Sequence, residues 1–547
     1  MRSSLADTPA KGRIRHIKED GDLQKALNDA ACGETVELQA GGTYRGLFKV
    51  PAKKCDDSHW IIIRSSDSDH DLPPEGTRLK PCYAGVGELQ GRPPFHCSQV
   101  KNVIARLQFE GNTGSGPIML ETGANHIRFM GLEITRKSSN ATVSNLISLE
   151  SRGTADHIVF DRMWIHGTTH DETTRGILLG GSTNVAIVDS FFSDFHCTAR
   201  TGACVDSQAI AGGIGDNPMG PYKIANNYLE GAAEGILFGG GPATATPSDI
   251  EIRINHIFKP LAWRPGNADF VGANDGQPFI VKNLFELKNA RRVLFENNIL
   301  ENVWGGFSQA GFAVLLTPKN QGQNSCPECQ VTDITIRYCR IKHMASGLQI
   351  ANGLSDNGSQ ALAGYGYSVH DVLFEDIGGP NYKGMGILAQ ISMALPLLHD
   401  VKLDHITAFP PKALFMIGGP VSGEKMHGFS FTNSIVAAGQ NQIMSTGGGP
   451  LKNCAAQPDR KGIKGVLDDC FSAYEFHHNA ILGGDRGYPR NNTEVKQIED
   501  LGFSSYGTGN PGDYHLLPAS RLKRHASDDK DVGADIEAID SRTADAQ

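Results

Sequence analysis

The chain has 547 residues, more than a single hydrophobic core usually holds, so several domains or a repeat architecture are expected. Its 64 glycines suit many tight turns and fit poorly with a protein of long helices. A net charge of −9 and a pI near 6.1 argue against a protein that grips nucleic acid through its phosphates. No apolar run approaches the length of a membrane span, so we expect no membrane partner.

The first predicted element is a short helix over residues 22–32, where apolar side chains recur at helical spacing. Gly33 follows as a candidate C-cap, and residues 34–38 predict a strand. A helix before the first repeat would cover the open end of a stacked core. We therefore expect an N-terminal cap over residues 14–55.

Eleven short stretches then set two apolar residues one position apart, which is typical of half-buried strands. The stretches recur every roughly 27 to 45 residues, within the range of repeat proteins. The second apolar residue of each pair is Phe129, Phe160, Ile187, Ile224, Ile252, Phe295, Ile336, Phe374, Leu403, Phe431 or Phe476. Four stretches carry an asparagine three positions later: Asn227, Asn255, Asn298 and Asn479. We interpret these asparagines as a structural ladder between coils.

A second series of strands follows the first and indicates at least two strands per coil. Its members are 145–149, 175–179, 208–211, 234–238, 283–287, 311–315 and 386–389. The longest insertions lie at about residues 193–220, 259–281 and 353–368, and loops are where a rigid scaffold usually carries its function. The repeats are predicted to end near residue 482.

Eleven cysteines are many for a cytosolic enzyme. Ten of them form pairs that lie close in sequence: Cys32 with Cys55, Cys82 with Cys97, Cys197 with Cys204, Cys326 with Cys329, and Cys454 with Cys470. We expect disulfides in an oxidising compartment, with ordinary reduced cysteines as the alternative. The start of the chain lacks the apolar core of a signal peptide. The cysteines favour a secreted or periplasmic protein whose export signal is absent from this sequence over a cytosolic one.

The repeat strands, the asparagines in register and the cap helix together resemble the right-handed parallel β-helix superfamily typified by pectin and pectate lyases. Several segments are also similar to secreted bacterial β-helix repeat proteins, among them 161–167, 206–210, 247–253, 255–263 and 282–289. The resemblance implies an all-β solenoid, with a β-helix over residues 56–482. It also implies a C-terminal tail over 483–547 that is packed on the helix or partly disordered.

The resemblance is specific for fold and weak for chemistry, because β-helices host lyases, hydrolases, epimerases and non-catalytic proteins. The Asn-Thr-Asp, Asp-Asp and Gly-His-Gly motifs of polygalacturonase-like hydrolases do not occur together, and the Arg-x-Pro-x-x-Arg stretch of pectate lyases is absent. The catalytic residues of those families therefore cannot be transferred to this chain.

The second strand series indicates an outward groove. If Leu287 points inward, Glu286 and Lys288 point outward, since side chains alternate along a strand. The positions equivalent to Lys288 on other strands are Glu150, Gly180 and Gly239. Glycines beside Glu286 and Lys288 would leave a shallow backbone floor for an extended sugar chain.

A uronate lyase must neutralise a carboxylate, remove the adjacent C5 proton and assist the leaving oxygen. We expect Asp206 and Glu234, with Glu286, to serve as neutralisers or ligands of a hard cation such as Ca²⁺, and Lys288 or His256 to act as the base. The substrate-binding candidates are Lys259, Lys282, Trp263 and Trp304. Surface salt bridges and turn caps are the alternative interpretation of all these charges.

The sequence therefore predicts a monomeric, carbohydrate-active enzyme that cleaves an acidic polysaccharide, most simply by β-elimination. One alternative is a glycoside hydrolase on the same fold that uses two carboxylates such as Asp206 and Glu234. The other is a non-catalytic carbohydrate-binding or surface protein.

Overall fold

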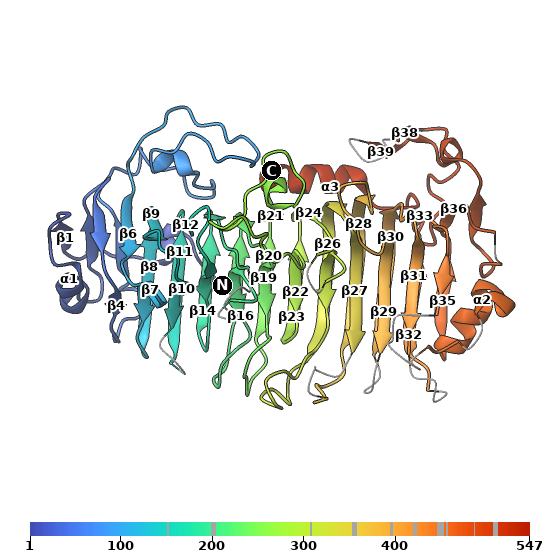
Figure 1. Ribbon diagram of the computed structural model, residues 1–547, viewed down its shortest axis with the longest axis horizontal. Coiled ribbons are helices and arrows are strands. Elements are labelled where there is room, and N and C mark those ends of the chain that lie inside the picture. Colours follow the sequence, from blue (N-terminus) through green and yellow to red (C-terminus); the bar gives the residue numbers. More distant parts are fainter. Residues whose placement is uncertain are drawn as a thin grey trace. The chain divides into compact units, whose positions relative to one another are not determined.

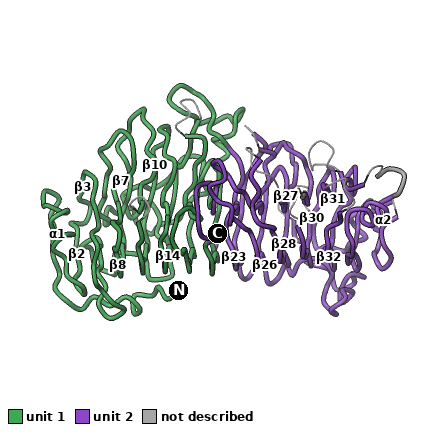
Figure 2. The backbone as a smooth tube through the Cα atoms, turned by 90° about the horizontal axis from the view of Figure 1, so that it is seen from below, with its two compact units in different colours: residues 1–237, 247–280 green, residues 238–246, 281–547 purple. Residues whose placement is uncertain are grey.

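The computed structural model describes residues 1–149, 153–198, 204–306, 309–352, 358–393, 398–419, 424–445, 453–455, 458–485, 487–506 and 512–547 (Figure 1). The chain forms two compact units, which are described separately below (Figure 2). Unit 1 comprises residues 1–237 and 247–280, and unit 2 comprises residues 238–246 and 281–547.

Unit 1 consists of parallel strands in three series, one strand of each series per coil. The first series is β1 (Ile14–Ile17), β2 (Thr35–Leu38), β5 (Ile61–Ser65), β8 (Ala124–Met130), β11 (Ala155–Asp161), β14 (Thr183–Val188), β17 (Tyr222–Ala225) and β20 (Ser248–Arg253). The second series is β3 (Thr43–Arg45), β6 (Ala105–Phe109), β9 (Leu132–Arg136), β12 (Trp164–His166), β15 (Phe191–Ser193), β18 (Tyr228–Glu230) and β21 (His256–Phe258). The third series is β4 (Phe48–Val50), β7 (Gly114–Leu120), β10 (Val143–Leu149), β13 (Thr173–Leu178), β16 (Gln208–Gly212) and β19 (Glu234–Phe238), whose last residue belongs to unit 2.

The core of unit 1 is a column of repeat residues in register. The column is Phe129, Phe160, Ile187, Ile224 and Ile252, and each side chain lies opposite the next in paired strands. All five are buried, and the rings of the two phenylalanines stack with their centroids 5.3 Å apart. The repeat predicted from the sequence is therefore confirmed as the interior of a coil stack.

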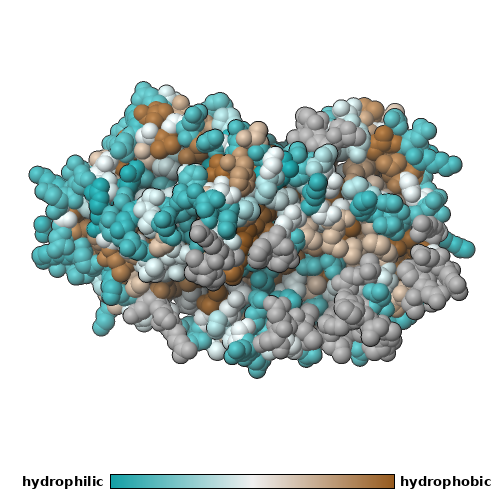
Figure 3. All heavy atoms as spheres, in the orientation of Figure 1, coloured by the Kyte–Doolittle hydropathy of each residue, from teal (hydrophilic) through white to brown (hydrophobic). Residues whose placement is uncertain are grey.

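Helix α1 (Leu23–Asp29) covers the first coil of unit 1 and confirms the predicted cap helix. Asp22 caps its N-terminus by accepting a hydrogen bond from the Lys25 amide, and Leu23 and Leu27 are buried. The predicted C-cap was wrong, because the helix ends at Asp29, four residues before Gly33. On the face drawn in Figure 3, hydrophilic side chains dominate the end that carries α1 and β1.

The outer surface of the second series in unit 1 is covered by a long segment, residues 66–104, which no sequence pattern predicts (Figure 1). Leu72 and Leu79 of this segment pack with Trp164 and Tyr228 of the strands. Alternation along β12 turns Trp164 outward, and the covering segment buries it. The segment therefore turns an outward face into a second apolar layer.

Unit 2 continues the same design with fewer and longer strands. Its strands are β22 (Phe285–Leu287), β23 (Ala290–Glu296), β24 (Ile299–Val303), β25 (Phe312–Leu316), β26 (Val331–Met344), β27 (Ser346–Asn352), β28 (Tyr365–Ile377), β29 (Ile387–Met393), β30 (His399–Ala408), β31 (Ala413–Gly418), β32 (His427–Thr432), β33 (Ile435–Ala437), β34 (Ile443–Met444), β35 (Tyr474–His477), β36 (Ala480–Leu482), β37 (Thr493–Val495), β38 (Phe503–Ser505) and β39 (Asp513–Leu516). Its helices are α2 (Pro458–Cys470) and α3 (Ile536–Thr543).

One predicted repeat residue of unit 2, Phe374, is out of register with the others. Phe374 pairs with Ile341, which lies in the second series, whereas Val369 pairs with Ile336 in the first. The first and second series are fused in β28, so a single strand carries two apolar pairs five residues apart. The sequence pattern matches the second of these pairs better, because the residues around Phe374 are more apolar.

The C-terminal segment packs on unit 2. α3 contacts β26 and β28, and its Ile536 and Ile539 are buried with Leu501 and Tyr514 (Figure 1). β37 extends the coil stack beyond the predicted end of the repeats by pairing with β36. Packing on the β-helix, rather than disorder, describes this part of the tail.

The asparagines form the predicted ladder. In unit 1, Asn255 Oδ1 accepts hydrogen bonds of 3.0 Å from both the backbone amide and Nδ2 of Asn227. Asn255 Nδ2 donates to the Ile224 carbonyl at 2.9 Å. In unit 2, Asn479 Nδ2 donates to Asn492 Oδ1 at 2.9 Å. These buried amides satisfy turn backbone that would otherwise lose its hydrogen bonds.

All five predicted cysteine pairs are disulfides in the structure. Cys339 is free and buried in β26, and burial raises the pKa of its thiol to about 12. None of the described helices has the length and apolar character that a membrane crossing requires. The monomeric state stays a prediction.

Candidate functional site

A buried polar row lies at the start of the third strand series in unit 1. Arg175 pairs in register with Gln208, and Gln208 Nε2 donates to Glu234 Oε2 at 2.8 Å. Burial lowers the pKa of Arg175, and the charges of Asp206 and Glu234 oppose that shift. The structure therefore brings Asp206 and Glu234, both predicted from the sequence, to the same arginine.

Lys259 belongs to the same buried region and contacts backbone. Its Nζ donates to the carbonyls of Gly231 at 2.7 Å and Ala233 at 3.1 Å, in the turn between β18 and β19. Burial lowers the pKa of Lys259 to about 7, against the attraction of Glu234. The side chain has no exposed surface, so this conformation does not favour direct binding of a sugar by Lys259.

The surroundings of Glu234 do not suit Ca²⁺. The carboxylate is fully buried, accepts a hydrogen bond from Gln208 and lies in the field of Lys259 and Arg175. Calcium sites gather six to eight oxygen ligands with excess negative charge. Nearby cations already balance this carboxylate, so we derive no catalytic step through Ca²⁺.

His256 and Trp263 are packed inside unit 1. The His256 ring meets Tyr228 and Phe258 edge-on, at centroid distances of 5.4 and 5.5 Å. Trp263 ends a 3₁₀ turn (Leu261–Trp263) and has no exposed surface. Its ring contacts His196 and Phe279. Neither side chain reaches solvent enough to serve as an open sugar platform.

Lys288 and Glu286 form a polar pair at the end of β22 in unit 2. Lys288 Nζ lies 3.2 Å from Glu286 Oε1, and Asn283 Nδ2 donates to Glu286 Oε2 at 3.1 Å. The Glu286 side chain is 2% exposed, whereas that of Lys288 is 14% exposed. Lys288 is thus the member of the pair that solvent or a substrate can reach.

Two glycines make room beside Lys288. A Cβ at Gly239, whose φ is +104°, would lie 2.7 Å from Lys288 Cβ, so only glycine fits there. A Cβ at Gly240 would lie 3.7 Å from Lys288 Nζ. The glycine expected next to Lys288 is therefore present, and it leaves backbone beside the amine. Glu150, the first position of the predicted groove, lies outside the described residues.

The remaining substrate-binding candidates also lie in unit 2. Lys282 is half-buried in the segment that leads into β22. Trp304 directly follows β24 and is 5% exposed. Their roles stay predictions, since their surroundings neither require nor exclude contact with a sugar.

A charged cluster in unit 1 was missed. Arg92, from the covering segment, donates from Nε and Nη2 to the two Glu230 carboxylate oxygens at 3.0 and 2.9 Å, and it also pairs with Asp194. Burial opposes the charge on Arg92, yet the two carboxylates raise its pKa well above the usual value. Burial lowers the pKa of the adjacent His196 to about 4. Nothing in the aperiodic sequence around Arg92 indicates this partnership.

A cavity of about 480 Å³ lies where the long loops of unit 1 meet. Its lining includes His170, Asp171, Glu172 and residues 273–275. Asp171 accepts hydrogen bonds from Ser138 and Thr168, and Glu172 Oε1 accepts from Thr198. This acidic lining would repel a uronate, so the cavity does not support binding of an acidic sugar chain.

A cluster of Asp57, His126 and His157 in unit 1 was also missed. The repeat itself could have revealed it, because each histidine stands three residues before a core phenylalanine of the column. Strand register then places the two histidines in adjacent coils.

No protein-family model matches the chain, and no curated protein matches its sequence. Several solved structures share its fold. A mannuronic acid-specific family 6 polysaccharide lyase from human gut microbiota has a TM-score of 0.50 and 11% identity, over 87% of each chain. A pectate lyase has a TM-score of 0.38 and 12% identity, over 97% of this chain and 98% of its own. A family 28 exopolygalacturonase from Yersinia enterocolitica has a TM-score of 0.37 and 13% identity, over 87% and 79%.

Parallel strands in three series, an internal asparagine ladder and the likeness to the family 6 lyase structure define a right-handed parallel β-helix fold.

Proposed function

We propose that the chain is a carbohydrate-active enzyme that cleaves a uronate-containing polysaccharide by β-elimination, with Lys288 as the proton acceptor. The observation that carries this proposal is the position of Lys288. Of the predicted bases, His256 is packed among aromatic rings, whereas the Lys288 amine is partly exposed beside two glycines. Two of the solved structures with this fold are lyases, one of them specific for mannuronic acid.

The reaction follows from these groups. The neutral Lys288 amine takes the C5 proton of a uronate, the C–H electrons form the C4–C5 double bond, and the C4–O bond breaks as the leaving oxygen takes a proton from solvent water. Glu286 stabilises the ammonium that forms, since its oxygen lies 3.2 Å from Nζ.

The five disulfides support action in an oxidising compartment, which is where extracellular polysaccharides occur. Lys282 of the same unit, which is half-buried, is the proposed contact to the sugar chain. Glycoside hydrolysis by Asp206 and Glu234 is less well supported, because Glu234 is fully buried.

The test is incubation with a panel of uronate polysaccharides, with and without chelator, followed by the ultraviolet absorbance of unsaturated products. Lys288→Met should lower the rate at least about 100-fold, the usual worth of a positioned base. Lys412→Met is the matched control, since Lys412 is an exposed lysine of unit 2. Circular dichroism and melting of both variants establish that they fold.

Three outcomes oppose the proposal. If Lys288→Met kept full activity, Lys288 would not be the base. New reducing ends without ultraviolet absorbance would indicate hydrolysis. Neither signal on any substrate would favour a non-catalytic protein.

A further inference from the structure

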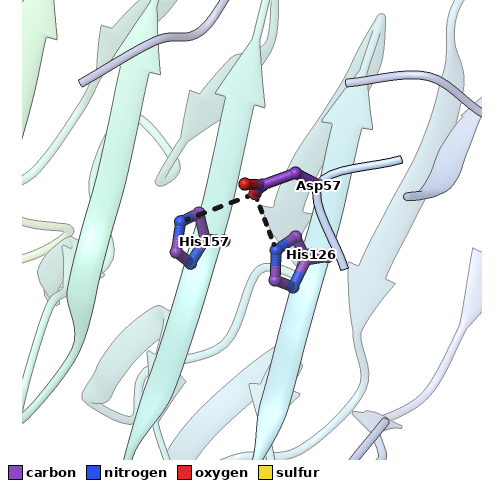
Figure 4. Close-up of side chains that lie close together, drawn as sticks. All are labelled: Asp57, His126 and His157. Atoms are coloured by element: carbon purple, nitrogen blue, oxygen red, sulfur yellow. Dashed lines mark hydrogen bonds and ion pairs between the residues drawn. The ribbon is translucent and has the colours of Figure 1, made fainter. Parts of the chain in front are cut away.

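We propose that Asp57, His126 and His157 of unit 1 form a binding site for a divalent transition metal of the Zn²⁺ type, separate from the proposed elimination chemistry (Figure 4). The three side chains come from the loop before β5 and from the starts of β8 and β11. Figure 4 shows both imidazole rings directed at the same carboxylate.

The ligand atoms are already close to a coordinating arrangement. Asp57 Oδ1 lies 3.1 Å from His126 Nε2 and 3.9 Å from His157 Nε2, and one donor atom of each residue lies within 4.8 Å of the others. Ligands at about 2.0–2.2 Å from a tetrahedral zinc are themselves about 3.3 Å apart. Binding would move the Asp57 carboxylate, whose side chain is 85% exposed, and would also turn the two imidazole rings out of their parallel stack, because an ion lies close to the plane of each ring that binds it.

The two rings are held in position by the coil stack. They occupy the same register position in adjacent coils, with centroids 4.4 Å apart and planes 4° from parallel. Trp60 meets the His126 ring edge-on at 5.1 Å. Both histidines have left-handed backbone, with φ of +52° and +53°, so the strand starts turn them to the same side.

A carboxylate orients one ligand. His157 Nδ1 lies 2.7 Å from Asp156 Oδ2, and the other Asp156 oxygen accepts hydrogen bonds from Thr183 Oγ1 at 2.6 Å and Asn184 Nδ2 at 2.9 Å. Asp156 therefore holds the proton of His157 on Nδ1, which leaves the lone pair of Nε2 directed at Asp57. A carboxylate bonded to the second nitrogen of a histidine is the usual support of a metal ligand.

The loop that carries Asp57 is anchored to the histidine strand. The Cys32–Cys55 disulfide fixes the loop two residues before Asp57. Asn125, the neighbour of His126, donates from Nδ2 to the Cys55 carbonyl at 3.1 Å. The disulfide and this hydrogen bond thus hold the backbone of the loop beside the strand that carries His126.

The donor set selects the class of metal. Two imidazoles and one carboxylate suit Zn²⁺, Co²⁺, Ni²⁺ or Cu²⁺, whereas Ca²⁺ and Mg²⁺ prefer oxygen ligands only. The exposure of Asp57 leaves at least one coordination position to water or to a ligand from solution.

Equilibrium dialysis of the full chain against Zn²⁺, with metal analysis, tests the proposal. The wild-type chain should bind one Zn²⁺, and His157→Gln should abolish this binding. Asp156→Asn should weaken the binding about 10- to 100-fold. The control is His427→Gln, which alters the second His/Asp cluster, His399, Asp400 and His427 of unit 2. Cobalt substitution should give the intense visible bands of a low-symmetry, four- or five-coordinate site.

The proposal is overturned if wild-type protein holds no Zn²⁺ at micromolar concentration, or if His157→Gln retains it. Loss of the metal in His427→Gln instead would place the site in unit 2. Lyase assays have no bearing on these outcomes, because Lys288 is not part of the cluster.

Discussion

Replacing Asn255 with alanine should destabilise unit 1 because it removes three buried hydrogen bonds at once. Its Oδ1 accepts from the Asn227 amide and Nδ2, both at 3.0 Å, and its Nδ2 donates to the Ile224 carbonyl at 2.9 Å. The substitution leaves the Asn227 amide and the Ile224 carbonyl short of a partner in a fully buried turn. At about 1–3 kcal/mol for each such group, the expected loss of stability is about 2–6 kcal/mol.

Two measurements check this loss. Urea denaturation followed by circular dichroism should show an earlier transition, and hydrogen exchange by mass spectrometry should show faster exchange of the peptide that contains Asn227. Asn28→Ala, on the exposed side of α1, is the control and should change stability by less than about 0.5 kcal/mol. If urea denaturation and hydrogen exchange of Asn255→Ala matched those of the wild type, the asparagine ladder would not contribute to the stability of unit 1.

Three further outcomes are expected. Arg92→Met should lower the free energy of unfolding by about 3–5 kcal/mol, measured by heat or urea, because it leaves Glu230 buried without its partner. A loss below about 1 kcal/mol, which is typical of an ion pair at the surface, would contradict the burial of this pair. The pKa of Lys259 is about 7 when folded and 10.5 when exposed, so the folded chain binds fewer protons between these values and stability should rise with pH there. Lys259→Met should abolish that rise. If stability rose with pH in the variant as it does in the wild type, Lys259 would not be its cause. Mass measurement with and without reductant should show five disulfides and one free thiol.

Much of the fold could be predicted because two patterns can be read directly from the sequence. One is the alternation of apolar residues along each strand, and the other is the regular recurrence of the strands. Phe129 and Phe160 were placed in one column by pattern alone, and strand pairing confirms this register. The assignment failed at Phe374, because β28 carries a second apolar pair five residues after Val369, the residue that pairs with Ile336.

The candidate site could be predicted only in part, because burial depends on what covers a strand. Lys288 follows β22 with 14% of its side chain exposed, and the glycine predicted beside it lies next to its Cβ. Lys259 was expected to face a substrate, yet the turn before β19 encloses it. The covering segment of residues 66–104 has no periodicity, so neither Arg92 nor the burial of Trp164 was visible in the sequence.

The central claim is that cleavage proceeds by elimination rather than by addition of water. The most direct measurement is the mass of the new chain ends formed in water enriched in heavy oxygen. Elimination should give ends that are unsaturated, lighter by one water than hydrolysis products, and free of heavy oxygen. Ends that carry heavy oxygen would contradict it.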